Sequence, residues 1–210
     1  MPSGVHHARV TVIELPAGAL VVLVGVSGSG KSTFAERHFA PTAILSSDAF
    51  RAMVADDAAD QRATRAAFEL LHLAARRRLE RRRLTVVDAT SVTRPARLSL
   101  VAISRETRRP AVAIVLDPPL AICLERNAKR PGRRVDPNVV ARQAEELSGW
   151  LVGPDPLHDE GFAAVHHVGD PGAVSTVSIA RSGRRGTAWA APGRLDALPA
   201  RRLTDRRTAR

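Results

Sequence analysis

Residues 20–32 of this 210-residue chain are Leu-Val-Val-Leu-Val-Gly-Val-Ser-Gly-Ser-Gly-Lys-Ser. The first five residues are apolar and mostly β-branched, which is typical of a strand buried on both faces. A loop is expected from Gly25 to Gly30, and a helix is expected to begin near Lys31. The last eight residues fit the pattern G-x-x-x-x-G-K-[ST] at every defined position, and a strand before it and a helix after it are the context in which this pattern holds phosphate.

The loop therefore has the chemistry of a nucleoside-triphosphate site. Its glycines let backbone N–H groups turn toward phosphate oxygens, and the helix adds its positive dipole end. Lys31 is expected to reach the β- and γ-phosphates, and Ser32 to hold Mg²⁺ or Mn²⁺. A chance turn rich in glycine and serine is the alternative, which the flanking strand and helix argue against. The expected ATP contacts in this segment are Gly25, Ser27, Gly28, Ser29, Gly30, Lys31, Ser32 and Thr33.

Short apolar strands alternate with helical segments along the rest of the chain. This alternation predicts parallel β-α-β units and a three-layer α/β fold with a parallel sheet. Such sheets bind ligands beyond the carboxyl ends of their strands, where Asp48, Asp88 and Asp117 fall. The expected strands are 20–24, 43–46, 84–87 and 111–116, with 162–167 and 174–179 as further strands at the sheet edge. The expected helices are 31–39, 68–79, 95–107, 120–127 and 138–147.

The residues after the second strand suggest an acceptor site. A kinase that acts on a hydroxyl gains from a carboxylate that accepts the hydroxyl proton, and Asp48 can do this. Arg51 could bind an anionic group of the acceptor through two parallel hydrogen bonds. The alternative is that Asp48 caps a helix that begins at Ala49. Asp88 ends the third strand, the usual place for a carboxylate near Mg²⁺, although a surface aspartate there is also common.

A basic cluster after the strand 111–116 predicts a helical lid. Arg126 and Arg130 are four residues apart and point the same way on a continuing helix, which Pro131-Gly132 then breaks. Such a flap can close over ATP and stabilise charge on the transferred phosphate. A solvated basic helix end is the alternative, and it is the interpretation we favour for the arginines of residues 76–83. The lid cluster comprises Arg126, Lys129, Arg130, Arg133 and Arg134.

Composition limits the class of protein. Apolar residues make up 44% of the chain, which is enough for a sizeable core. The net charge of +11 attracts polyanions. A coding bias toward alanine and arginine would give the same charge balance. A single cysteine, Cys123, fits the reducing cytoplasm and is expected to be a buried small hydrophobe. No apolar segment is long enough for a membrane span, and the adjacent pairs His6-His7 and His166-His167 point apart, so we expect no metal there.

The domain organisation is expected to be simple. Residues 1–9 read as an N-terminal extension and residues 10–181 as one kinase domain. Residues 182–210 are rich in arginine, alanine, proline and glycine without a sustained period, which predicts a basic disordered tail.

Four segments together resemble the kinase module of bacterial polynucleotide kinase-phosphatase, an end-healing enzyme of RNA repair. They are the phosphate loop with Ser-Thr-Phe-Ala, then Ser-Ser-Asp at 46–48, Val-Val-Asp-Ala-Thr at 86–90, and Glu-Arg-Asn at 125–127. The resemblance implies transfer of the ATP γ-phosphate to a 5′-hydroxyl end of RNA or DNA. It implies that Asp48 is the general base, that Arg51 grips an acceptor phosphate and that Asp88 lies near the metal. Arg126 would be the lid arginine on ATP. Arg130 of the same basic cluster is also expected to contact ATP, as part of the lid.

The chain also departs from that family. Ser91 stands where relatives often carry Asn, and a basic residue, Arg97, follows at a place where the family also has one. No phosphatase metal motif is present, so we expect no phosphatase activity. A separate phosphatase and ligase are candidate partners, which the sequence does not decide, and no membrane is expected. Two other functions stay open: a P-loop kinase of a small hydroxyl compound such as a sugar or an antibiotic, and a non-catalytic nucleotide-binding module, against which Asp48 and Arg51 argue.

Overall fold

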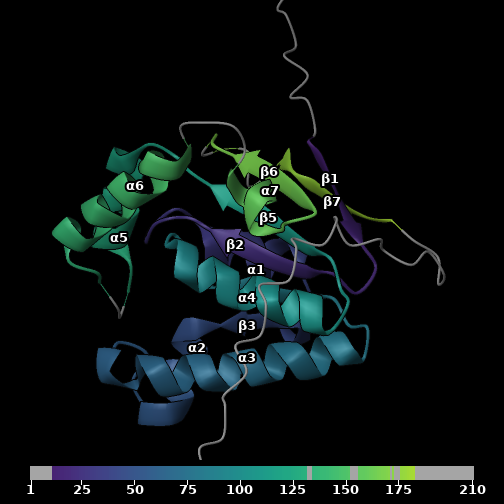
Figure 1. The fold of residues 1–210 in the computed structure, drawn as a ribbon. Coiled ribbons are helices and arrows are strands. Elements are labelled where there is room, and N and C mark those ends of the chain that lie inside the picture. The colour runs from purple at the N-terminus through teal and green to yellow at the C-terminus, as the bar shows by residue number, and fades with distance from the viewer. Residues whose placement is uncertain (1–10, 132–133, 152–155, 171, 173–175, 183–210) are drawn as a thin grey trace, which may run out of the picture.

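The computed structural model describes residues 11–131, 134–151, 156–170, 172 and 176–182. They form the expected three-layer α/β fold around a five-stranded sheet in the order β3-β4-β2-β5-β6 (Figure 1). Every neighbouring pair in this sheet is parallel. The strands are β2 (Leu20–Val24), β3 (Ile44–Ser46), β4 (Thr85–Asp88), β5 (Ala111–Leu116) and β6 (Ala164–Val168).

The central strand β2 explains why the sheet is covered on both faces. Leu20, Val22 and Val24 belong to one apolar cluster, and the alternate residues Val21 and Leu23 belong to the other. Because side chains alternate across a strand, a continuous apolar run buries both faces of the sheet. One cluster packs against α3 to α7, and the other against α1 and β1 (Val12–Pro16).

The helices lie close to their expected positions. In α3 the spaced residues Leu71, Ala75 and Leu79 are fully buried, as the amphipathic pattern predicts. Figure 1 shows α5 and α6 side by side at one end of the fold, away from α3. The helices are α1 (Lys31–His38), α2 (Ser47–Ala55), α3 (Thr64–Glu80), α4 (Arg94–Glu106), α5 (Leu120–Lys129), α6 (Pro137–Leu151) and α7 (Pro156–Glu160). Two short 3₁₀ turns are η1 (Pro41–Ala43) and η2 (Gln61–Ala63).

One predicted strand was assigned to the wrong sheet. The segment expected at 174–179 contributes β7 (Ser178–Ser182), which pairs in parallel with β1 in a separate two-stranded sheet and not with the main one. The segment expected at 162–167 does extend the main sheet, as β6 beside β5. The alternation in β1 buries Ile13 and Leu15 and leaves Val12 and Glu14 exposed, so the small sheet covers one face of the core.

The chain outside this core is described only in part. The expected extension 1–9 and all of the expected tail except Ser182 lie outside the described residues. Among the described residues no helix is both long and apolar enough to cross a membrane.

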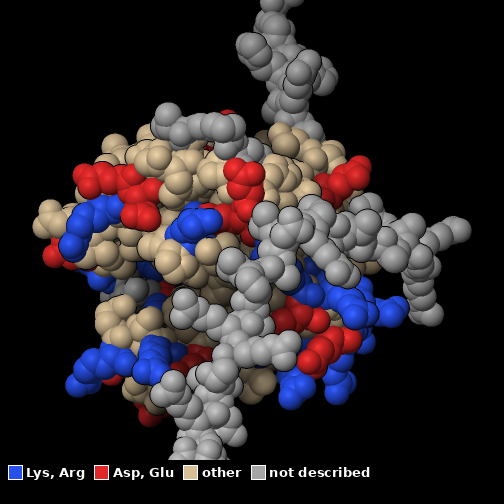
Figure 2. All heavy atoms as spheres, viewed as in Figure 1, with Lys and Arg blue, Asp and Glu red and all other residues tan. Residues whose placement is uncertain are grey.

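The arginines at the end of α3 lie at a solvated helix end, as favoured from the sequence. Arg76 pairs with Glu106 at 2.8 Å and Arg77 with Glu80 at 3.1 Å, while Arg78 donates to the carbonyl of Leu84. On the face shown in Figure 2, basic side chains lie near the C-terminal end of α3, and acidic side chains lie over α6 and α7.

Candidate active site

The phosphate loop is wedged between β2 and α5. Its first residue, Gly25, donates its N–H to the carbonyl of Thr90 at 3.1 Å, which ties the loop to the segment after β4. Gly28 has φ 83°, and a Cβ there would lie 2.1 Å from the carbonyl oxygen of Cys123 in α5. Only glycine fits this close approach, so the glycines of the motif serve the packing of the lid helix as well as the loop turn.

A pocket of about 520 Å³ opens at the carboxyl end of the sheet. Most of the expected ATP contacts line it, including Arg126 and Arg130 of the lid cluster, while Gly25 and Ser29 do not. The sequence did not single out Arg37 of α1 or the serines before Asp48 as lining residues. The lining residues are Ser27, Gly28, Gly30, Lys31, Ser32, Thr33, Arg37, Ser46, Ser47, Asp48, Asp88, Ala89, Thr90, Arg126 and Arg130.

The Lys31 amine lies inside the loop and not out in solvent. Its Nζ donates to the carbonyl of Val26 at 2.8 Å and to Ser29 Oγ at 3.4 Å, and the side chain is buried. Burial lowers the pKa of Lys31 to about 8, although the charge of Asp88 acts in the opposite direction. An anionic phosphate beside this amine would favour its charged form, so the site is electrostatically suited to a triphosphate.

Ser32 and Asp88 meet where the resemblance expects a metal. The hydroxyl of Ser32 donates to Asp88 Oδ2 at 2.8 Å. Burial raises the pKa of Asp88, while the hydrogen bond from Ser32 lowers it. In the described part of the chain no group of three His, Cys, Asp or Glu residues could hold a metal alone. One hydroxyl and one carboxylate oxygen fit Mg²⁺, which usually completes its shell with water and substrate phosphates.

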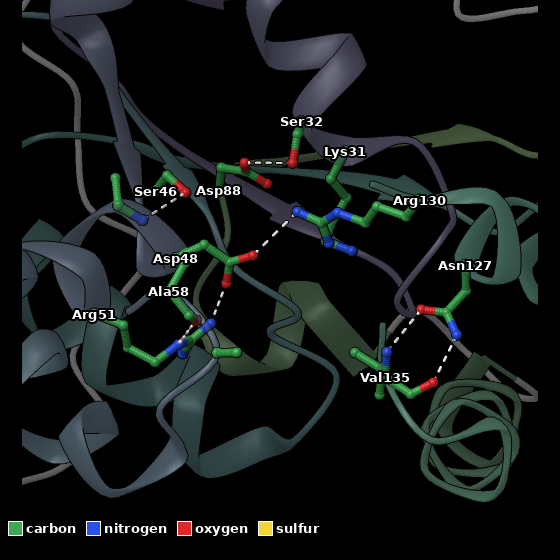
Figure 3. A network of polar contacts seen from close by, with 12 residues as sticks. Lys31, Ser32, Ser46, Asp48, Arg51, Ala58, Asp88, Asn127, Arg130 and Val135 are labelled. Atoms are coloured by element: carbon green, nitrogen blue, oxygen red, sulfur yellow. Dashed lines mark hydrogen bonds and ion pairs between the residues drawn. The ribbon is translucent and has the colours of Figure 1, made fainter. Parts of the chain in front are cut away.

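Asp48 is held from two sides and does not cap a helix. The N-cap of α2 is Ser46, whose side chain accepts from the N–H of Ala49, so the capping alternative for Asp48 was wrong. Asp48 lies in the first turn of α2, where it forms an ion pair with Arg51 through Oδ1 and with Arg130 through Oδ2, the latter at 3.1 Å (Figure 3). The carboxylate therefore points into the space between the phosphate loop and the lid.

Arg51, which was expected to bind an anionic group of the acceptor, does not face the pocket. Its side chain is buried, its Nε donates to the carbonyl of Ala58 at 2.9 Å, and it does not line the pocket. Its guanidinium orients Asp48 in this structure.

The lid is organised by Asn127, which the sequence offered only as part of a motif. Its side chain donates to the carbonyl of Val135 at 2.6 Å and accepts from the N–H of the same residue at 3.1 Å. This pair of hydrogen bonds joins the C-terminal part of α5 to the chain just before α6. Arg126 approaches the phosphate loop, because a Cβ on Gly30 would lie 3.6 Å from its Nη1. Of the expected lid cluster, Lys129 pairs instead with Glu125, Arg134 is exposed, and Arg133 lies outside the described residues.

Arg97 is a buried structural residue and does not line the pocket. Its guanidinium binds Glu160 through two hydrogen bonds of 2.7 and 2.6 Å and lies 4.2 Å from the ring centroid of Trp150. It also donates to the carbonyls of Ser91 and Val92. Ser91 has φ 49°, a left-handed conformation that Asn adopts more readily than Ser, so the departure at this position concerns the backbone.

Cys123 and the two histidine pairs are the remaining residues that the sequence raised as candidates. Cys123 is fully buried in α5, and burial raises the pKa of its thiol, as expected for a small hydrophobe. His166 and His167 are successive residues of β6 and so point to opposite faces, while His6-His7 lies outside the described residues.

The family model of the AAA domain matches residues 20–154, which include the phosphate loop, both candidate carboxylates and the lid. The chain belongs to this family. No curated protein matches the chain.

Solved structures share the fold at low sequence identity. A candidate kinase from Chloroflexus aurantiacus is 17% identical with a TM-score of 0.53, over 72% of this chain and 87% of that one. A chain of the Pnkp1/Rnl/Hen1 RNA repair complex is 22% identical with a TM-score of 0.56, over 70% of this chain and 47% of that chain. This chain thus spans about half the length of that relative. A gluconokinase from Sinorhizobium meliloti is 20% identical with a TM-score of 0.46, over 77% and 87%.

The phosphate loop, the family and the fold together define an ATP-binding protein of the P-loop kinase type, a phosphotransferase.

Proposed function

We propose that this protein is an ATP-dependent polynucleotide 5′-hydroxyl kinase, which transfers the γ-phosphate of ATP to the 5′-hydroxyl end of RNA or DNA. The observation that carries the proposal is the position of Asp48. Its carboxylate lines the same pocket as Lys31 and Ser32 and comes from the first turn of α2, just after β3, so it would face a bound nucleotide from the acceptor side.

This geometry supports a direct transfer. The acceptor hydroxyl oxygen attacks the γ-phosphorus, the bond to the β–γ bridging oxygen breaks and ADP leaves, while Asp48 takes the hydroxyl proton. Lys31 and the loop N–H groups bind the phosphates, and Arg126 and Arg130 lie where they can stabilise charge on the group in transfer. Bound Mg²⁺ or Mn²⁺ would neutralise phosphate charge, held by Ser32 and Asp88.

Three further features favour a polynucleotide acceptor. The pocket carries Arg37 in addition to the lid arginines, and Arg37 is exposed where it could meet a further phosphate. The net charge of +11 suits a polyanionic substrate. A fold similar to part of a protein in an RNA repair complex supports the same class. A phosphatase and a ligase are the further activities that end healing would require.

A kinase of a small hydroxyl compound is the second candidate, and the placement of Arg51 favours it. That side chain is engaged by Asp48 and Ala58 away from the pocket lining, so the expected grip on an acceptor phosphate would require it to move.

The two candidates are separated by an acceptor panel. The protein is incubated with γ-labelled ATP and Mg²⁺ and with one RNA and one DNA oligonucleotide of the same sequence, each with a 5′-hydroxyl or a 5′-phosphate, and with a sugar acid and a sugar alcohol. We expect label only on the 5′-hydroxyl strands, and none with Lys31→Ala. Label on the small compounds alone would overturn the polynucleotide assignment.

A further inference from the structure

One side chain of α6, the helix that follows the lid cluster, contacts the phosphate loop directly. Gln143 of α6 accepts through Oε1 the backbone N–H of Ser27, at an N–O distance of 2.9 Å in a half-buried position. The two residues are far apart in the sequence, and no motif links them. The contact lies outside every role assigned above to the loop or the lid.

The helical spacing explains why Gln143 points inward. Val140 and Leu147 of α6 are buried in the core, and Gln143 lies three residues after the first and four before the second. Residues at these spacings share one face of a helix. Gln143 is therefore a polar residue within an apolar stripe, and its amide oxygen meets a backbone donor there.

The same peptide group is held on its other side by the catalytic lysine. Ser27 N–H and the Val26 carbonyl belong to one planar peptide unit. The carbonyl accepts from Lys31 Nζ at 2.8 Å and from the N–H of Ser29 at 3.1 Å. Gln143 thus fixes the N–H end of the peptide whose carbonyl end holds the lysine.

The C-terminal end of α6 is anchored to the segment that follows β4. Trp150 donates its indole N–H to the carbonyl of Val92 at 2.9 Å, and the guanidinium of Arg97 covers its ring. Gln143 precedes Trp150 by about two helical turns. The anchor at Trp150 and the buried residues Val140 and Leu147 therefore both hold the face of α6 that carries Gln143.

We propose that Gln143 is a positioning residue for phosphotransfer: it fixes the orientation of the Val26–Ser27 peptide and, through the Val26 carbonyl, the position of Lys31. Rotation of this peptide would turn the carbonyl away from the lysine amine and leave that amine without its nearest acceptor. The inference rests on the phosphotransfer part of the proposed function and is independent of which acceptor is phosphorylated.

The experiment tests the amide oxygen of Gln143, which accepts the hydrogen bond from Ser27. Gln143→Met keeps the length and the apolar contacts of the side chain and removes the amide oxygen, whereas Gln143→Glu keeps an oxygen acceptor. We expect kcat to fall about fivefold to tenfold in the Met variant, because a loss of this size corresponds to the net free energy of one hydrogen bond. We expect the Glu variant to keep most of kcat and to show a raised KM for ATP, because its charge repels phosphate. Arg142→Met, an exposed neighbour on the same helix, serves as the control and should match the original protein.

A packing role predicts the opposite order. If Gln143 only fills space, the Met variant should equal the original protein and the Glu variant should be the worst of the three. That order would overturn the proposal.

A second measurement needs no acceptor substrate, and its first result needs only the original protein. Amide hydrogen exchange in the ligand-free protein should show Ser27 N–H protected, and exchange about tenfold faster in Gln143→Met. Unprotected Ser27 in the original protein would overturn the proposal even if the Met variant failed to fold. If no 5′-hydroxyl strand is phosphorylated, the polynucleotide proposal fails, and Ser27 exchange still decides on Gln143.

Discussion

Arg130, the first residue after α5, donates from Nη2 to Oδ2 of Asp48 at 3.1 Å, so a residue of the lid occupies the carboxylate oxygen that the acceptor hydroxyl would need. The other oxygen of Asp48 is paired with Arg51. Both carboxylate oxygens of the candidate base are therefore paired with arginines in this structure. Since phosphate competes with a carboxylate for arginine, ATP is the ligand that would draw Arg130 away.

This relationship predicts an order of binding. In Arg130→Gln the acceptor should bind more tightly than in the original protein when ATP is absent, because Oδ2 of Asp48 is released. Phosphotransfer should nevertheless be slower, since a cation beside the γ-phosphate is lost. Fluorescence anisotropy of a labelled 5′-hydroxyl strand without nucleotide measures the first effect. Arg134→Gln, an exposed change in the same lid, is the control, and equal acceptor binding by both variants would contradict a gating role for Arg130.

The pKa of Lys31 predicts how ATP affinity depends on pH. Burial lowers this pKa to about 8, so the free protein loses the lysine charge as the pH rises through that value. The charged amine is the form that attracts phosphate, and the dissociation constant for ATP should therefore rise above about pH 8 and level off below it. Isothermal titration across this range measures it. Lys31→Arg should show no such inflection, because guanidinium stays charged.

Replacement of Asp48 should separate binding from chemistry. Asp48→Asn keeps the shape of the side chain and cannot take a proton, so kcat should fall about 10²- to 10⁴-fold while ATP affinity changes little. Rapid-quench measurement of one turnover and a separate ATP titration report the two quantities. The matched control is Asp56→Asn, which lies at the exposed C-cap of α2 in a left-handed conformation that asparagine also adopts. Loss of ATP binding in Asp48→Asn would instead point to a structural role.

The buried pair of Arg97 and Glu160 should dominate local stability. Arg97→Met leaves the buried carboxylate of Glu160 with only the more distant Arg94, at 3.8 Å, and should lower the free energy of unfolding by about 3–5 kcal/mol. The double variant with Glu160→Gln should recover part of this loss. Urea unfolding followed by tryptophan fluorescence measures both, since Trp150 contacts the pair. A single variant as stable as the original protein would show that the pair contributes nothing.

The central fold could be predicted because its signals are local. The apolar run of β2 and the glycine pattern after it specify a strand, a loop and a helix within a few residues of one another, and the structure has all three. The same holds for the spaced core residues of α3. Asp88 and Ser32 could be brought together because parallel strands end at the same edge of a sheet.

The features that escaped prediction depend on distant partners. Arginine is normally an exposed residue, and the burial of Arg97 requires Glu160, which nothing in its own neighbourhood indicates. The contact of Gln143 with Ser27 is likewise set by how α6 packs. Asp48 could be read as a cap or a base because both use the same residue type, and only the position of Ser46 decides that it is not the cap.

The pairing of β1 with β7 has a consequence for how the chain is made. A ribosome delivers Ile13 and Leu15 early, whereas their partner strand, Ser178–Ser182, is delivered after every strand of the main sheet. Contacts between segments so distant in sequence close late, because the entropy of joining them must be overcome first. During synthesis the five-stranded sheet can therefore assemble before β1 has its partner strand. Pairing of β1 with β7 is then the last step in forming the two sheets. A nascent chain halted before residue 178 would expose one edge of β1 to chaperones and proteases.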